Sequence, residues 1–350
     1  MTTVLAALNS ALRQALIQDE RVLLMGEDIL DPYGGAFKVT RGLSEAFPER
    51  VLTTPISEAG FVGVATGMAL RGLRPVVEIM FGDFVTLIAD QLTNHAAKFR
   101  WMYNEQVSVP LVVRTPMGGR RGYGPTHSQT LEKLFLGIPG LRVLAPGALG
   151  DPGKLLLDAI LVDDDPVLFI ENKLLYLSQV QEPASEGEFI IQERLPEPSE
   201  VQLVAGGKTP AYTPVYTLSL RGAPAASLTL TAYGYMAELA RQAALRLAYE
   251  HEVFCELVIP TQLSPFDTTA LDESLTRTGR LLTVEEGTHA LGWGAETVAG
   301  AAERLGTRLR VARRLAAMDL PVPSSAVLEE IVLPGVNQLV ESGLKIAQNR

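Results

Sequence analysis

Short apolar runs alternate with helical patterns along the first half of the chain. Leu8, Leu12 and Leu16 recur every four residues, as on one face of a helix, and residues 21–26 (RVLLMG) then form a short apolar run typical of a strand. Helical patterns separate further apolar strands, which we expect to end at Pro55, Met80, Pro116, Pro146 and Asn172. This alternation predicts a mostly parallel sheet with helices on both faces.

A polar, proline-rich stretch then interrupts the alternation. Glutamate, proline, serine and glycine dominate residues 178–210, which is typical of an interdomain connection. Strands and helices resume with SLTLTAYG and continue to a last helix from Ala326. We therefore predict an α/β domain over residues 1–190, a linker or insertion over 191–225, and a smaller α/β domain over 226–350.

Composition narrows the class of protein. The 350 residues are 47% hydrophobic, enough for two cores, and the net charge of −10 without a long basic run argues against nucleic acid as a partner. Cys255 is the only cysteine, which excludes an intrachain disulfide and a multi-cysteine zinc site. No apolar stretch approaches membrane-spanning length and the N-terminus lacks the pattern of a signal peptide, so we expect a cytoplasmic protein without a membrane partner.

Candidate chemistry lies where the predicted strands end. Ligands of parallel sheets bind beyond the carboxyl ends of the strands, because the loops there vary and helix N-termini point at the ligand. Polar or aromatic side chains follow four successive strands: Glu27, Asp28, Glu58, Phe81, Asp83, Phe84 and His127. Met80 ends the third of these strands.

Each of these side chains also has a purely structural interpretation. Glu58 could cap a helix N-terminus, and so could Glu27. Met80 and Phe84 could belong to the core, and His127 could be held by a neighbouring side chain or a backbone carbonyl. Their joint placement at strand ends favours the functional interpretation.

Other common site patterns are missing from the sequence. The remaining histidines have no metal-ligand spacing, so we predict no metal site on this chain and interpret them as structural or surface residues: His95, His251 and His289. There is no Walker loop, no glycine fingerprint after the first strand and no G-x-S-x-G elbow. These absences weaken nucleotide-binding and hydrolase hypotheses.

Several long motifs resemble one family. MGEDILDPYGGAFKVTRGL, TTPISEAGFVGVATGMALRGLRPVVEIMFGDF, GPTHSQ and DDDPVLFIENKLLY occur in the order and at the spacing of the beta subunits of thiamine diphosphate-dependent 2-oxoacid dehydrogenases. That group includes the pyruvate, branched-chain 2-oxoacid and acetoin enzymes. The resemblance implies a transketolase-like fold, in which a parallel-sheet pyrimidine-binding domain precedes a smaller C-terminal domain.

The resemblance also implies roles for five residues. Glu58 matches the glutamate that hydrogen-bonds the cofactor's aminopyrimidine ring and thereby activates the cofactor. Phe84 matches the aromatic residue that stacks on this ring, and Met80 matches an apolar contact with it. Glu27 matches a second acid near the active site, and His127 matches the histidine that faces the substrate and the lipoyl group. The implied catalytic residues are thus Glu58, His127 and Glu27.

Half of the cofactor site is missing from the sequence. The chain lacks the G-D-G and downstream asparagine by which this superfamily holds Mg²⁺ and the diphosphate. The resemblance therefore implies an alpha subunit that supplies them in an α2β2 assembly, with activity only in that assembly and a lipoyl-bearing acyltransferase as a further partner.

The chain departs from the family at several positions. IPTQ at 259–262 stands where the family usually has D-L-R-T. Arg120 and Arg121 replace smaller residues and could meet an acidic substrate, a neighbouring subunit or solvent. Asp163 and Asp165 lie near a loop that binds a monovalent cation in some members, although the same pattern fits a plain acidic turn.

The predicted reaction is decarboxylation of a pyruvate-like or branched-chain 2-oxoacid, followed by transfer of the acyl group to a lipoyl carrier. A transketolase-like carboligase or acyl-transferase half-subunit is one alternative, and a non-catalytic scaffold of the same fold is another. The sequence leaves the 2-oxoacid open, because the pocket would be shared with the alpha subunit and one methylene changes discrimination by only about 1–3 kcal/mol.

Overall fold

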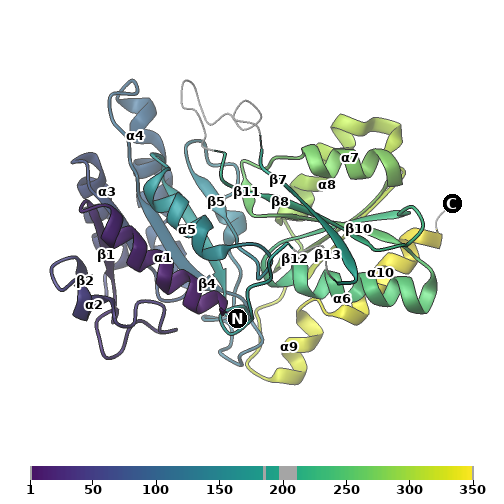
Figure 1. The fold of residues 1–350 in the computed structure, drawn as a ribbon, viewed down its shortest axis with the longest axis horizontal. Coiled ribbons are helices and arrows are strands. Elements are labelled where there is room, and N and C mark those ends of the chain that lie inside the picture. The colour runs from purple at the N-terminus through teal and green to yellow at the C-terminus, as the bar shows by residue number, and fades with distance from the viewer. Residues whose placement is uncertain (1, 184–186, 197–210, 349–350) are drawn as a thin grey trace.

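The computed structural model describes residues 2–183, 187–196 and 211–348. Two sheets lie side by side, each covered by helices (Figure 1). The first half of the chain builds most of the first sheet, and the second half builds the second sheet. The predicted connection at 178–210 falls partly outside the described residues. Within the described residues, no helix is long and apolar enough to cross a bilayer.

The first sheet confirms the predicted parallel architecture. Its strands run in the order β11-β5-β6-β4-β3-β1-β2. All neighbours pair in parallel except β11, which is antiparallel to β5. The strands are β1 (Val22–Gly26), β2 (Val51–Thr53), β3 (Arg74–Glu78), β4 (Val112–Met117), β5 (Arg142–Leu144), β6 (Val167–Asn172) and β11 (Gln262–Ser264).

Helices cover both faces of this sheet. Val76 packs into the cluster formed with α1 and α5, whereas its neighbour Val77 packs into the cluster formed with α3, because successive strand residues point to opposite faces. The helices are α1 (Val4–Gln18), α2 (Leu43–Ala46), α3 (Glu58–Leu70), α4 (Ala97–Met102) and α5 (Pro152–Leu161). The helical pattern at 84–103 is split into 3-10 helix η1 (Gly82–Ile88), π-helix η2 (Gln91–Ala96) and α4.

The second sheet is mixed and runs in the order β13-β12-β9-β10-β8-β7. Its strands are β7 (Phe189–Arg194), β8 (Val215–Leu220), β9 (Leu228–Ala232), β10 (Cys255–Pro260), β12 (Arg280–Thr288) and β13 (Val311–Ala317). Its helical elements are α6 (Gly234–His251), α7 (Thr269–Thr278), α8 (Trp293–Leu305), η4 (Gly306–Arg308), α9 (Ala326–Val332) and α10 (Val336–Gln348).

Part of the predicted linker belongs to this second sheet. Strands β7 and β8 pair antiparallel there, and Tyr216 and Leu218 of β8 are buried in its core. The described ends of the linker are therefore ordered strands, since their apolar residues have a core to enter. The domain boundaries at residues 190 and 226 stay predictions.

One strand from the second half of the chain joins the first sheet. Gln262 of β11 pairs with Leu144 of β5, and its Oε1 accepts a hydrogen bond of 3.1 Å from Nε of the buried Arg142. Gln262 ends the IPTQ motif that departs from the family pattern. The departure therefore has a structural use, because a buried guanidinium needs an acceptor.

A buried ion network ties three neighbouring strands of the first sheet together. Arg114 of β4 donates from Nε and Nη2 to the Glu171 carboxylate of β6, at 2.8 and 2.7 Å, and from Nη1 to Glu78 of β3. The Tyr176 hydroxyl completes the network by donating to Glu171 at 2.6 Å. Burial raises the pKa of Glu78, and the Arg114 charge opposes that rise. The network fixes the strand ends from which the loops of the candidate site begin.

We predict that Arg114→Met lowers the free energy of unfolding by about 3–5 kcal/mol, because it leaves two buried carboxylates without their cation. Urea denaturation measures the loss. Arg304→Met is the control, since Arg304 pairs with Asp272 at a partly exposed site, and its loss should stay below about 1 kcal/mol. Equal losses in both variants would show that the network does not hold the strands.

Candidate active site

The five residues singled out by sequence lie at one edge of the first sheet. Glu27 directly follows β1, Glu58 begins α3 after β2, Met80 and Phe84 follow β3, and His127 lies in the loop after β4. These four strands are neighbours and run in parallel, so their carboxyl ends meet at the same edge. The tertiary structure thus gathers side chains that are up to 100 residues apart.

Two acids form the first part of this site. Glu27 and Glu58 are each only 7% exposed. Burial raises the pKa of Glu27, and the negative charges of Glu58 and Asp28 raise it further. The burial and the nearby negative charges thus favour the protonated form of Glu27.

Glu58 lies in the first turn of α3, where a carboxylate suits the helix dipole, whereas Glu27 precedes no helix and caps none. Ser57 is the N-cap residue of α3, and its side chain makes no capping hydrogen bond. Within the described residues, the buried Oε1 of Glu27 has no hydrogen-bond partner. A buried acceptor without a partner costs free energy, so this part of the structure suits a polar ligand that supplies a donor.

His127 sits edge-on against two phenylalanines. Its ring centre lies 5.3 Å from that of Phe84 and 4.7 Å from that of Phe81, at interplanar angles of 80° and 77°. The Thr126 hydroxyl lies 3.0 Å from Nδ1. After His127 the chain forms a single 3-10 turn, η3 (Glu132–Leu134). Lys133 donates from this turn to Thr288, and Glu132 accepts a hydrogen bond of 2.5 Å from the Tyr233 hydroxyl, so the turn is bonded to the second half of the chain. The imidazole is thus oriented by aromatic faces and not by a helix.

Lys173 is a candidate site residue that the sequence reasoning missed. It follows β6, is fully buried, and donates from Nζ to the His127 carbonyl at 2.5 Å. The ammonium also lies 5.3 Å from the Phe81 ring centre and 5.6 Å from that of Tyr123. Burial lowers the pKa of Lys173 to about 8, with the negative charge of Asp83 opposing the shift. Its position at the end of a fifth parallel strand, in ENKLLY, was the signal that could have identified it.

The glycine-rich loop before His127 is held by the second half of the chain. Backbone N–H groups of Gly119 and Arg120 donate at 2.7 Å to Glu286 of β12 and Glu329 of α9, respectively. The Arg120 guanidinium lies 3.4 Å from Glu286 and donates to the Pro334 carbonyl. Arg120 therefore fixes the loop to its own chain, whereas Arg121 is exposed and reaches the Lys173 carbonyl at 3.3 Å.

The acidic turn at 163–165 is occupied by ion pairs. Asp163 pairs with Arg142 and accepts a hydrogen bond of 2.7 Å from the Tyr212 hydroxyl. Asp165 accepts one of 2.6 Å from Nε of Arg100. The described residues contain no cluster of three or more histidine, cysteine or acidic side chains that could hold a metal ion.

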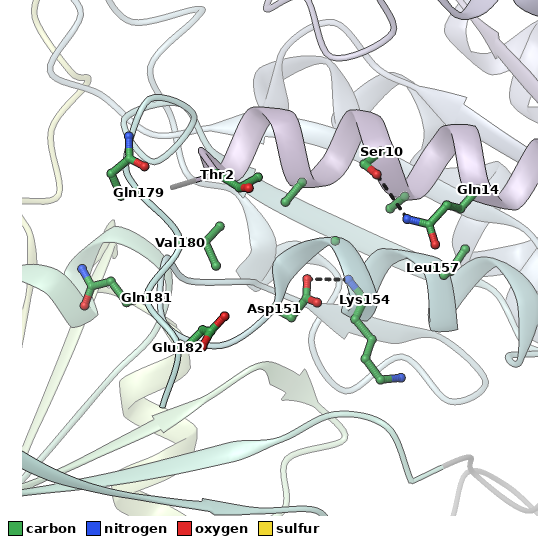
Figure 2. A pocket seen from close by; sticks show the side chains of 13 residues that line it. Thr2, Ser10, Gln14, Asp151, Lys154, Leu157, Gln179, Val180, Gln181 and Glu182 are labelled. Carbon is green, nitrogen blue, oxygen red and sulfur yellow. Dashed lines mark hydrogen bonds between the residues drawn. The ribbon is translucent and has the colours of Figure 1, made fainter. Parts of the chain in front are cut away.

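A large cavity lies away from this edge. It has a volume of about 960 Å³ and lies beside α1 and α5, where Ser10, Gln14, Asp151 and Lys154 line it together with Gln179 to Glu182 (Figure 2). None of the five predicted residues is among its lining residues. The chemistry of the strand ends, and not the volume of a cavity, therefore identifies the candidate site.

Comparisons with known proteins show which family the two parts of the chain resemble. Residues 1–179 match the transketolase pyrimidine-binding domain, and residues 221–339 match the transketolase C-terminal domain. A solved structure entitled "Split gene transketolase, inactive beta4 tetramer" covers 99% of both chains with a TM-score of 0.71. It is 20% identical in sequence, so it supports the fold alone.

Three relatives show the family more closely. The pyruvate dehydrogenase E1 component subunit beta-1 of Arabidopsis thaliana is 36% identical, over 97% of this chain and 88% of its own. The corresponding subunit beta of Rickettsia conorii is 34% identical, over 98% of both chains. The beta subunit of acetoin:2,6-dichlorophenolindophenol oxidoreductase from Cupriavidus necator is 34% identical, over 97% of this chain and 95% of its own. The chain therefore belongs to the transketolase-like family, in the group formed by the E1 beta subunits of 2-oxoacid dehydrogenases.

Proposed function

We propose that this chain is the beta half of a thiamine diphosphate-dependent enzyme that decarboxylates a pyruvate-like or branched-chain 2-oxoacid and passes the acyl group to a lipoyl carrier. The observation that carries the proposal is the buried pair Glu27 and Glu58 at the strand edge that also holds Phe84 and His127. A scaffold needs none of these side chains in this arrangement, since an unpaired buried acid costs stability.

The residues at this edge fit the pyrimidine half of the cofactor. Within the described residues, the buried Oε1 of Glu27 has no hydrogen-bond partner, and the Phe84 ring is only partly buried. Glu58, Met80 and Phe84 would hold the ring, with Glu58 at a ring nitrogen and the other two on its faces. When bound, thiamine diphosphate supplies the nucleophilic carbon and the electron sink of the reaction.

The acid pair would act on protons. Glu58 would hold a proton at the ring nitrogen. Because the pKa of its neighbour Glu27 is raised, Glu27 would stay protonated more readily and would add less negative charge beside Glu58. Shielding from water strengthens this interaction, since both carboxyl groups are buried. Glu58 is thus the proposed activating residue and Glu27 its supporting acid.

His127 would serve the substrate. The two phenylalanine rings orient its imidazole, which would bind the 2-oxoacid and move a proton during acyl transfer. Lys173 would act as a positioning residue, because it holds the backbone carbonyl of His127 and not its ring.

We propose that an alpha subunit completes the site. The sequence lacks the element that would hold Mg²⁺ and the diphosphate, and apolar side chains are exposed beside Glu58, with Ile56 87% and Val64 57% exposed. Exposed apolar surface around a site is typical of a protein interface. An α2β2 assembly would cover it, with a lipoyl-bearing acyltransferase as a further partner. We expect the assembly in the cytoplasm, although the plant relatives are named as mitochondrial proteins.

We predict that thiamine diphosphate with Mg²⁺ binds the complex with the alpha subunit and not this chain alone. The reason is that each chain would hold only half of the cofactor. Calorimetric titration of both samples measures this, and assay of the loaded complex with lipoamide separates acyl transfer from carboligation. Binding to neither sample would favour a scaffold, and a carboligation product without acyl-lipoamide would favour a transketolase-like enzyme.

We predict that Glu58→Gln in the complex lowers 2-oxoacid turnover at least about 100-fold, because general acid–base catalysis contributes 10²–10⁴-fold and the amide cannot exchange the proton. Reduction of an artificial electron acceptor measures turnover. The exposed Glu49→Gln is the matched control and should keep full activity. Normal turnover in Glu58→Gln, with an unchanged melting temperature in both variants, would remove Glu58 from the mechanism.

We predict that kcat of the complex falls as pH rises through about 8, where Lys173 loses its proton and its bond to the His127 carbonyl weakens. The charged form, present below that pH, is the active one. Lys173→Arg keeps its charge at higher pH, so the fall should move to more alkaline pH. Identical pH profiles of kcat in the two proteins would show that Lys173 does not position His127.

A further inference from the structure

The guanidinium of Arg74 donates hydrogen bonds to several converging backbone carbonyl groups. Arg74 is the first residue of β3, is 5% exposed, and is fixed in register opposite Val22 of β1. Its side chain reaches the end of α5 and donates from Nε to the Ile160 carbonyl at 2.7 Å. Nη2 donates to the carbonyls of Leu161 and Asp163, at 3.0 and 2.8 Å. Three carbonyls from one helix end and the following turn thus converge on one cation.

These carbonyls need a positive group. The last carbonyls of a helix lack intrahelical partners and carry the negative end of its dipole. A fourth acceptor, Oδ1 of Asp164, lies 3.0 Å from Nη1 and adds a full negative charge. A guanidinium meets this demand because it has five donors and keeps its charge when buried.

We propose that Arg74 is a built-in substitute for a bound monovalent cation at this turn. The family resemblance would place such an ion near Asp163, and the residues here do not fit one. The convergent carbonyl oxygens already accept hydrogen bonds from Arg74, and the carboxylates of Asp163 and Asp165 pair with Arg142 and Arg100. An ion would have to displace a guanidinium that is covalently attached to the chain and therefore loses little entropy when it occupies this position.

The presence of Arg74 in place of an ion matters for the first sheet as a whole. The backbone N–H group of Val109, before β4, donates to the Asp164 carbonyl of this turn, and that of Arg142, at the start of β5, donates to the carbonyl of Pro166 directly after it. Arg74 itself begins β3. The turn therefore sets the starting points of three strands, so an internal cation makes their order independent of the salt present. This inference does not depend on which reaction the site catalyses.

The test compares thermal unfolding of the full chain in KCl, NaCl and choline chloride at equal ionic strength. The wild-type melting temperature should be the same in the three salts. In choline chloride, the melting temperature of Arg74→Ala should lie about 5 °C or more below that of the wild type, because the carbonyls lose their donor. In KCl it should recover in part, because K⁺ can occupy the space among the carbonyl oxygens that Arg74 has left. The melting temperature of Arg74→Lys should lie between those of the wild type and Arg74→Ala, since an ammonium offers fewer donors than a guanidinium.

Arg50→Ala is the matched control, because Arg50 donates to a single carbonyl, that of Asp19, at a partly exposed position. Its melting temperature should change little and show no preference among the three salts. A wild-type protein that is stabilised by K⁺ over choline would overturn the proposal, and this measurement stands even if Arg74→Ala does not fold. Equal melting of Arg74→Ala and Arg50→Ala in every salt would overturn it as well.

Discussion

The carboxyl edge of the first sheet depends on one buried cation held between two buried anions. Arg114 joins β3, β4 and β6, and all three charges are nearly inaccessible to water. Such a network is costly to assemble and more costly to break, because each partner alone would be an uncompensated buried charge. It therefore allows little variation in where these strands end, and the loops that begin there carry Phe84, His127 and Lys173.

Buried charge is treated in opposite ways at the two ends of this sheet. At the amino end of β3, Arg74 satisfies carbonyls and a carboxylate, and the neighbouring acidic turn is neutralised by two further arginines. At the carboxyl edge, Glu27 keeps an unpaired oxygen beside Glu58. Structural charges are paired to give stability, whereas a site leaves polar groups unsatisfied so that a ligand can meet them.

The site is also a product of both halves of the chain. Glu286 and Glu329 come from the second half and hold the glycine-rich loop, and Arg120 adds an ion pair to the same contact. Lys173 then donates a hydrogen bond to the backbone carbonyl of His127, at the end of that loop. The second half thus holds the loop that carries a residue supplied by the first half.

The sequence by itself determined the parallel sheet, the order of its strands along the chain and the strand ends where chemistry gathers, because apolar periodicity and the strand-end rule are local. With help from the long motifs, it predicted Glu27, Glu58, Met80, Phe84 and His127 as site residues. It did not reveal the role of Lys173, the loop contacts of Glu286 and Glu329, the capture of Gln262 by the first sheet or the convergence of carbonyls on Arg74. The partners in these contacts are 46 to 209 positions apart in the chain, so only tertiary packing decides which buried group meets which partner.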